Sequence, residues 1–469
     1  MAIEAPTATV IKAIGSSLGF SLSDEDCKMY EGLLGDMCPA YERLAAMESP
    51  SPCQPGRGRG GSAPDVAENP YGAWAWRGPV APTGKGLLDG LSVGVKDAVC
   101  VAGMPARNGS ALLDDFVPEE DATVVTRILS AGGAIAGKTA CENLSYSGNS
   151  HTSTPVVRNP HNPAHSAGGS SSGNGAAIAA GDISMAIGCD QGGSIRIPSS
   201  WCGVVGLKPT RGLVPYTGAF SMDPDIDYCG PMGAHVEDVA RLLTVIAGPD
   251  GLDPRQSGLD WQPVHYLDEL AKKRLPRRIA LVREGFGRPE SEAETDRQVR
   301  ESILKFRSLG VEVDEVSVPT HLTCFDVWHS MVIEGTSELM FGANGLGGYG
   351  EGYASAEMLE AFASWRRHPS DVPVTALPPI LMGTYMQQRY QNRYYAKAKL
   401  LQKRMRDEFA AVLSRYDVMA MPTIPFRAVP LPPENATKLQ TIQAALPMVG
   451  NTSPYNASGN PAISIPCGT

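Results

Sequence analysis

The sequence predicts an α/β fold in which a large mixed β-sheet is covered on both faces by α-helices. Short apolar stretches alternate with helical stretches over about 400 residues, from residue 70 onward. The chain has 469 residues, of which 42% are hydrophobic, and this is enough to bury a large core. No fixed-period repeat is visible, so a solenoid is not expected.

Residues 1–69 are predicted to form a helical arm followed by a linker. The run SDED at 23–26 resembles a capping box and precedes apolar residues at helical spacing. Pro39 is expected to end or kink that helix. The stretch 49–70 is rich in proline, glycine and serine, which is typical of a linker. We therefore predict one large α/β domain over residues 70–469.

Within that domain, the elements follow one another in the order expected of β-α-β units. The predicted strands are 91–97, 134–139, 184–190, 277–284 and 311–318, and the predicted helices are 122–132, 175–181, 293–309 and 384–415. The glycine-rich stretch 342–355 is interpreted either as a lid or entrance loop or as a plain surface loop. Such alternation favours a parallel or mixed sheet.

Composition excludes several classes of function. Forty Lys and Arg against fifty Asp and Glu give a net charge of −10, which argues against nucleic-acid binding. The sequence contains no run of 18 apolar residues and no signal-peptide pattern at its start, so neither a membrane protein nor a secreted one is expected, and we predict a cytoplasmic location. The ten cysteines include no CxxC pair, so we expect reduced thiols and neither metal nor cofactor.

Two glycine- and serine-rich loops between residues 168 and 196 are the strongest candidates for chemistry. Neither fits the phosphate-binding pattern GxxxxGK[ST]. The run GSSSG at 169–173 does fit GxSxG, but that motif requires a buried strand before it, and the preceding stretch is polar and contains prolines. Both interpretations are therefore rejected.

The second loop offers a better setting for a nucleophile. Ser194 follows the predicted strand 184–190 and a turn with two glycines, which lets backbone N–H groups approach a substrate oxygen. A serine hydroxyl needs a positioned base, and no histidine lies near these loops in the sequence. Lys96 and Lys138 each end a predicted strand, and the sequence pattern alone does not choose between them.

The order of several motifs strongly resembles the amidase signature family of serine hydrolases. These are VGVKDAVCVAGMPARNGS, CENLSYSGNSHTS, the run GGSSSG…GCDQGGSIRIPSSWCGVVGLKPTRG, GPM and NTSPYNASGNPAISIPCG. The resemblance covers most of the chain from about residue 70. It is nearest to amidases associated with nitrile hydratases, and aryl acylamidases and urethane-cleaving members share much of the pattern. It implies the amidase-signature α/β fold.

The resemblance also implies roles for particular residues. It makes Lys96 the base, Ser170 a bridging serine after a cis peptide bond, and Ser194 the nucleophile. The implied oxyanion hole consists of the backbone amides of Gln191, Gly192, Gly193 and Ser194. A free lysine has a pKa of about 10.4, so a lysine base must be held neutral, and we expect the rate to rise into the alkaline range.

Other residues receive less defined roles. Ser171 either supports the relay or caps the following helix, and Asp190 and Arg196 could brace the nucleophile turn through charge-assisted bonds. Four residues are expected either in the substrate pocket or in the core: Tyr146, Phe325, Trp328 and Met331.

The resemblance implies hydrolysis of the C–N bond of small, aryl or apolar carboxamides through an acyl-enzyme. Carbamate or ester hydrolysis is the alternative, and the A subunit of an RNA-dependent amidotransferase fits the acidic charge and the motifs less well. A small amide or carbamate is the expected partner, with a homodimer left open. Family members normally continue with a further strand and helix beyond Thr469, and many carry histidine where this chain has Asn460.

Overall fold

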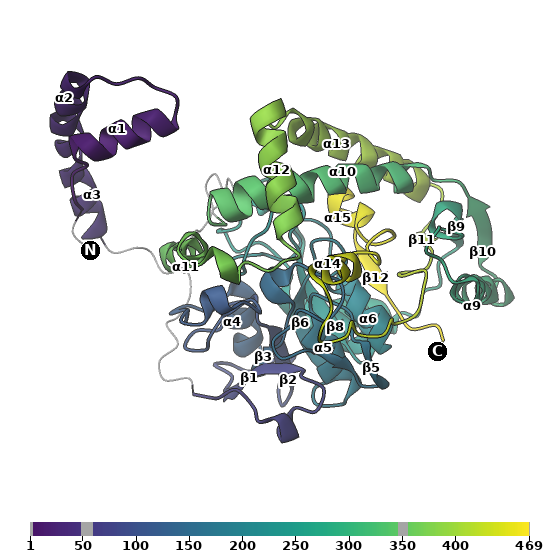
Figure 1. The fold of residues 1–469 in the computed structure, drawn as a ribbon. Coiled ribbons are helices and arrows are strands. Elements are labelled where there is room, and N and C mark those ends of the chain that lie inside the picture. The colour runs from purple at the N-terminus through teal and green to yellow at the C-terminus, as the bar shows by residue number, and fades with distance from the viewer. Residues whose placement is uncertain (1–2, 48–59, 346–354, 469) are drawn as a thin grey trace. The chain divides into compact units, whose positions relative to one another are not determined.

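The structure is a computed structural model that describes residues 3–47, 60–345 and 355–468. The chain divides into two compact units, residues 1–52 and 53–469 (Figure 1). Most of the predicted linker, at 48–59, lies outside the described residues. So do residues 346–354 of the glycine-rich stretch interpreted above as a lid or surface loop.

The described residues of the first unit, 3–47, form three short helices: α1 (Ala8–Ser17), α2 (Asp24–Gly35) and α3 (Cys38–Ala45). The capping box expected before α2 is present: Asp26 N donates to Ser23 Oγ at 3.0 Å, and Ser23 N donates to Asp26 Oδ2 at 2.9 Å. Pro39 lies in the first turn of α3, where a missing N–H costs nothing, so a new helix begins there.

A mixed sheet forms the centre of the second unit. Its seven strands within the described residues run in the order β1-β3-β2-β6-β8-β7-β12. Their bounds are β1 (Trp74–Val80), β2 (Ser92–Lys96), β3 (Ala134–Thr139), β6 (Met185–Cys189), β7 (Val205–Lys208), β8 (Cys229–Gly233) and β12 (Ala462–Ser464). Strand β2 is parallel to both β3 and β6, and the remaining pairs are antiparallel. The predicted mixed sheet is thus confirmed.

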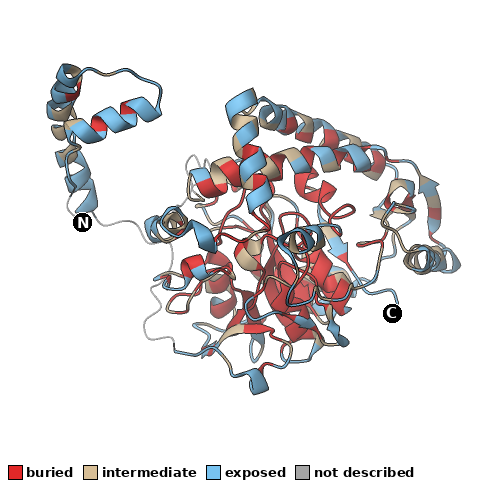
Figure 2. Ribbon diagram, viewed as in Figure 1, coloured by how far each residue is buried: buried red, intermediate tan, exposed pale blue. Residues whose placement is uncertain are grey.

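Helices cover both faces of this sheet, as predicted, and its strands are largely buried (Figure 2). On one face α4 (Thr123–Ser130) and α7 (Val236–Ile246) pack over apolar strand residues. On the other face lie α5 (Ser172–Ala179) and α6 (Arg196–Cys202). Helix α5 approaches the sheet closely because it is made of small residues: a Cβ on Gly173 would lie 2.2 Å from the carbonyl oxygen of Ala73.

The predicted β-α-β unit over 277–318 exists, but it belongs to a separate small sheet. Strand β9 (Arg278–Val282), helix α9 (Ala293–Leu304) and strand β10 (Glu312–Val316) follow one another, with β9 and β10 parallel. Strand β11 (Val418–Ala420) pairs with the other edge of β9. Alternating strands and helices therefore predicted the unit correctly without indicating which sheet it joins.

The predicted helix 384–415 is wrong as one element. The structure has α12 (Leu377–Tyr390) and α13 (Arg393–Leu413), separated by Gln391 and Asn392 at φ 51° and 55°. Two successive left-handed residues cannot continue a right-handed helix, so the chain turns there. Both helices pack on α10 (Thr320–Gly335), which also contacts α15 (Pro454–Ser458) (Figure 1).

The remaining α-helices and β-strands of the described residues are short. They are β4 (Arg158–Asn159), β5 (Asn162–Ser166), α8 (Tyr266–Ala271), α11 (Ala356–Phe362) and α14 (Lys438–Ala445). No helix in the described ranges combines the length and the apolar character needed to cross a bilayer.

Candidate active site

Three segments bring Lys96, Ser170 and Ser194 together. Lys96 ends β2, Ser170 lies in the loop before α5, and Ser194 lies in the turn between β6 and α6. Lys96 Nζ donates to Ser170 Oγ at 2.7 Å, and the Gly169–Ser170 peptide bond is cis. The Ser171 N–H donates to the carbonyl oxygen of Ser194 at 3.1 Å, which ties the two loops together.

Burial distinguishes the three side chains. Lys96 and Ser170 are fully buried, whereas Ser194 is 8% exposed and borders a cavity. Within the described residues no carboxylate lies within ion-pair distance of Lys96 Nζ. Lys96 is therefore buried beside a hydroxyl and without a counter-ion from the described part of the chain.

The register of the sheet separates the two lysines that the sequence left equivalent. In the β2–β3 pair, Lys138 lies opposite Val95, and Lys96 lies opposite Thr139. Since successive strand residues point to opposite faces, the two lysines point to opposite sides of the sheet. Lys138 Nζ contacts Asp97 Oδ1 at 3.3 Å and not the serine loops.

Hydrogen bonds hold the carbonyl groups of the turn that carries Ser194. Asn456 Nδ2 donates to the Asp190 carbonyl oxygen at 2.9 Å, and Trp328 Nε1 donates to that of Gln191 at 2.7 Å. The C=O and N–H of a planar trans peptide point in opposite directions. Fixing these two carbonyls therefore fixes where the N–H groups of Gln191 and Gly192 point.

The next two carbonyls are held in the same way. Thr452 Oγ1 donates to the Gly192 carbonyl oxygen at 2.6 Å, and Ile197 N donates to that of Gly193 at 2.7 Å. Every peptide from 190 to 194 is thus held on its carbonyl side. The turn is consequently pre-organised before any substrate binds.

Gly193 differs from the other members of the predicted oxyanion hole. Its N–H donates to Asp190 Oδ1 at 2.8 Å, so this donor is already used within the protein. In the described part of the chain, the N–H groups of Gln191, Gly192 and Ser194 have no protein acceptor. These three amides are the ones available to a developing oxyanion.

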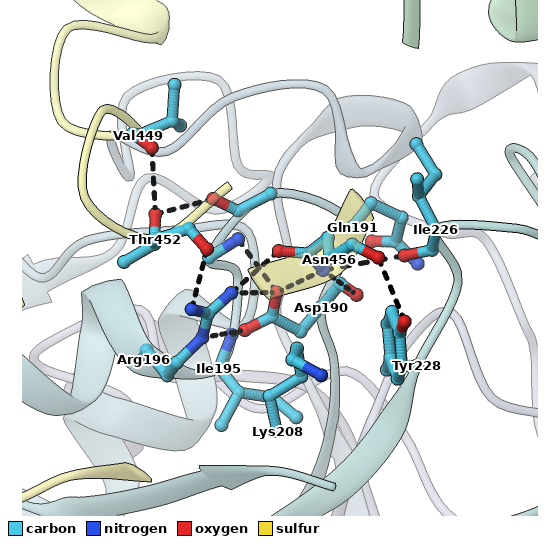
Figure 3. Close-up of polar contacts among 12 residues, drawn as sticks. Asp190, Gln191, Ile195, Arg196, Lys208, Ile226, Tyr228, Val449, Thr452 and Asn456 are labelled. Atoms are coloured by element: carbon cyan, nitrogen blue, oxygen red, sulfur yellow. Dashed lines mark hydrogen bonds and ion pairs between the residues drawn. The ribbon is translucent and has the colours of Figure 1, made fainter. Parts of the chain in front are cut away.

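Asp190 and Arg196 form a buried ion pair beneath the turn (Figure 3). Arg196 Nη2 and Nε contact the two carboxylate oxygens at 2.9 and 3.0 Å, and Arg196 Nη1 donates to the Thr452 carbonyl oxygen at 2.7 Å. Asn456 Nδ2 donates to the same carboxylate at 2.8 Å. Burial alone would raise the pKa of Asp190, but Arg196 and Asn456 outweigh it and lower the pKa to about 2.

Ser171 lies beside this arrangement. Its hydroxyl donates to the Cys189 carbonyl oxygen at 3.2 Å and does not cap α5. Of the two interpretations that the sequence left open, the helix cap therefore does not occur, and Ser171 instead links the first loop to the end of β6.

A cavity opens beside Ser194. It is lined by Ser145, Tyr146, Ser147, Gly148, Gln191, Gly192, Ser194, Ile197, Met222, Trp328, Val332, Leu446 and Val449. Of the four residues expected either in the pocket or in the core, Tyr146 and Trp328 line this cavity. Met331 is instead fully buried in the core, and Phe325 packs against the ring of Trp328 with centroids 5.7 Å apart, outside the lining. Their spacing on α10 did not show which face met the cavity.

Sequence reasoning missed the carboxylate of Glu142. It is fully buried and accepts hydrogen bonds from Thr152 N and Oγ1 at 3.2 and 2.7 Å. Its backbone N–H donates to the Ser170 carbonyl oxygen at 3.2 Å, and burial raises the pKa of its side chain. Glu142 is the only Asp, Glu, Lys or Arg between Lys138 and Arg158, and this isolation was the available signal.

Thr452 and Asn456 were also missed, although the motif that contains them was noted.

Replacing Thr452 with valine should remove the hydroxyl that holds the Gly192 carbonyl while conserving shape. We expect kcat to fall about tenfold with little change in KM, because the transition-state oxyanion depends most on the turn's orientation. Steady-state kinetics check this, with Thr452→Ser, which keeps the hydroxyl, as the matched control. A rise in KM alone would contradict it.

In this α/β fold, a serine at a cavity lies in a turn with oriented backbone amides, and a backbone hydrogen bond ties that turn to the loop of a lysine-bound serine. These are the parts of a hydrolase with a serine nucleophile. Comparison with known proteins agrees. The sequence model of the amidase family matches residues 75–469. The chain therefore belongs to the amidase signature family of hydrolases.

Individual relatives show how far the similarity extends. An enantioselective amidase of Rhodococcus rhodochrous is 39% identical over 98% of this chain and 89% of its own length. The A subunit of the glutamyl-tRNA(Gln) amidotransferase of Exiguobacterium sibiricum is 36% identical over 81% of this chain and 78% of its own.

Solved structures agree with the sequence comparisons. The same amidotransferase chain from Thermotoga maritima matches with a TM-score of 0.68 and 27% identity, over 86% of this chain and 82% of its own. A bacterial aryl acylamidase matches with a TM-score of 0.67 and 25% identity, over 82% and 77%.

Proposed function

We propose that the protein hydrolyses the C–N bond of small, uncharged, apolar carboxamides, aryl amides among them. The observation that carries this proposal is the lining of the cavity at Ser194. Among the described residues that line it, none has a charged side chain, and Tyr146, Met222 and Trp328 supply apolar surface. Such a wall favours an aryl or alkyl group beside the scissile bond.

The hydrogen bond between Lys96 and Ser170, and the backbone bond from Ser171 to Ser194, support a reaction through an acyl-enzyme. Ser194 Oγ attacks the amide carbonyl carbon and gives its proton to Ser170, which passes its own proton to neutral Lys96. The amides of Gln191, Gly192 and Ser194 stabilise the oxyanion. When the C–N bond breaks, the proton returns along the same relay to the leaving amine. Water then attacks the ester of Ser194 by the same route and releases the carboxylic acid.

Two alternatives follow from the same geometry. Carbamates and esters present a similar carbonyl, so the structure allows them in the same position. Glutamine, the amide donor that the A subunit of an amidotransferase would use, carries an α-ammonium and an α-carboxylate. Burying both in an uncharged pocket is costly, which favours neutral amides over glutamine.

A substrate panel on the purified chain tests the proposal. We expect kcat/KM for benzamide and hexanamide to exceed that for glutamine by at least about 100-fold, because a pocket without charges leaves the two charged groups of glutamine unpaired. Ammonia release measures the amides, and phenyl carbamate and phenyl acetate test the alternatives. Preference for glutamine, or no turnover of any amide, would contradict the proposal.

A further inference from the structure

We propose that Lys138 is a positioning residue for catalysis: its charge offsets that of Asp97 and thereby keeps Lys96 able to accept a proton. This inference rests on the proposed role of Lys96 as the base. Asp97 directly follows Lys96 in the chain, and a carboxylate next to a lysine normally stabilises the protonated lysine. A base needs the opposite.

Lys138 and Asp97 form an ion pair with each other. Lys138 is fully buried, and its Nζ lies 3.3 Å from Asp97 Oδ1, 3.3 Å from the Asp97 carbonyl oxygen and 3.3 Å from that of Pro105. Asp97 is 2% exposed, and its Oδ2 accepts the Gly109 N–H at 3.1 Å. A buried pair of this kind is electrically neutral as a unit.

The two lysines differ in what surrounds them. Lys138 has the carboxylate, whereas Lys96 has only the hydroxyl of Ser170 within the described residues. Asp97 follows Lys96 at the end of β2, and Lys138 on β3 directly precedes Thr139, the residue that pairs with Lys96, so the three residues lie at one end of the β2–β3 pair. A charge change at either member of the pair therefore reaches Lys96 through a poorly screened interior.

Other titratable groups near Lys96 are few. After β3, burial raises the pKa of Cys141, and it raises that of Glu142 behind Ser170. Across β6 and β8, the contact between the two thiols raises the pKa of Cys229 and lowers that of Cys189. The serines of the loop before α5 do not titrate. Among these groups, Cys189 is the one whose pKa is lowered.

Three variants test the proposal through the pH dependence of kcat/KM for benzamide, which reports ionisations of the free enzyme. Without the Lys138 charge, Asp97 favours protonated Lys96, so Lys138→Met should move the midpoint of the acid limb up by about one pH unit. Without the Asp97 charge, Lys138 disfavours protonated Lys96, so Asp97→Asn should move it down by about one unit. The double variant should return close to wild type.

The two single variants should shift the midpoint of the acid limb in opposite directions if Lys138 compensates the charge of Asp97. A merely structural role of the pair would lower activity without these opposite shifts. Lys138→Met leaves a buried carboxylate unpaired and could fail to fold. In that case the comparison of Asp97→Asn with the double variant decides, because the double variant should lie about one unit higher. Shifts of equal sign, or none, overturn the proposal.

Two controls complete the design. Cys189→Ser in each background should preserve the shifts, and their disappearance would assign them to the thiol and overturn the proposal. Lys96→Met tests the underlying function separately. If that variant retains wild-type activity, Lys96 is not the base and the proposed mechanism fails. If it is inactive while the limb does not move in the other variants, only the role of Lys138 fails.

Discussion

Replacing Ser194 with alanine should lower kcat/KM for amide hydrolysis by about 10⁴-fold or more, with the fold intact. Loss of a serine nucleophile has effects of this size in other hydrolases, because what remains is binding and oxyanion stabilisation without covalent chemistry. Ser194 borders the cavity, so removing its hydroxyl enlarges a space that already exists. Ammonia release measures the rate, and circular dichroism checks the fold.

A serine of the neighbouring loop supplies the matched control. The Ser171 hydroxyl donates to the Cys189 carbonyl oxygen and contacts neither Lys96 nor Ser194 through its side chain. Ser171→Ala should therefore cost at most about tenfold, the worth of one buried hydrogen bond. Similar losses in the two variants would point to a general disturbance of the loops, and residual activity of Ser194→Ala near wild type would exclude it as the nucleophile.

The sequence motifs located this site, but they did not distinguish its two candidate lysines. Lys96 and Lys138 each end a strand, and only the β2–β3 register shows that one faces Ser170 and the other faces Asp97. That register depends on pairing between segments about 40 residues apart, which a local pattern does not contain. The resemblance to the family chose Lys96, and the geometry is consistent with that choice.

The differences between expectation and structure have two physical origins, local backbone geometry and long-range contacts. The sequence predicted one continuous helix through Gln391 and Asn392 because neither residue strongly disfavours a helix. In the structure, both residues have left-handed backbone conformations, which end the helix. Gly193 looked equivalent to Gly192 in the motif, yet its N–H meets a carboxylate three residues earlier. The partners of the turn, Thr452 and Trp328, come from distant parts of the chain. Only the partners of the turn are long-range contacts; the other two cases depend on local backbone geometry.

Breaking the ion pair between Asp190 and Arg196 should lower the free energy of unfolding substantially. Asp190→Asn leaves the buried guanidinium of Arg196 without its counter-charge, and breaking a buried pair in this way costs about 3–5 kcal/mol. For a unit of this size that corresponds to a thermal midpoint about 5 °C lower. Activity should fall as well, because the same carboxylate accepts the N–H groups of Gly193 and Ile195.

The effect of Asp190→Asn should also depend on pH. The native pKa of Asp190, about 2, lies below the value of 3.8 for a free aspartate, so its ionised form stabilises the fold above about pH 4. That stabilisation is lost as the pH falls toward 2, and the gap in thermal midpoint between wild type and variant should narrow below pH 4. The exposed pair of Lys403 and Asp407 provides the control: Asp407→Asn should change stability by less than about 1 kcal/mol. Equal effects of the two aspartate substitutions would mean that burial gives the Asp190–Arg196 pair no special weight.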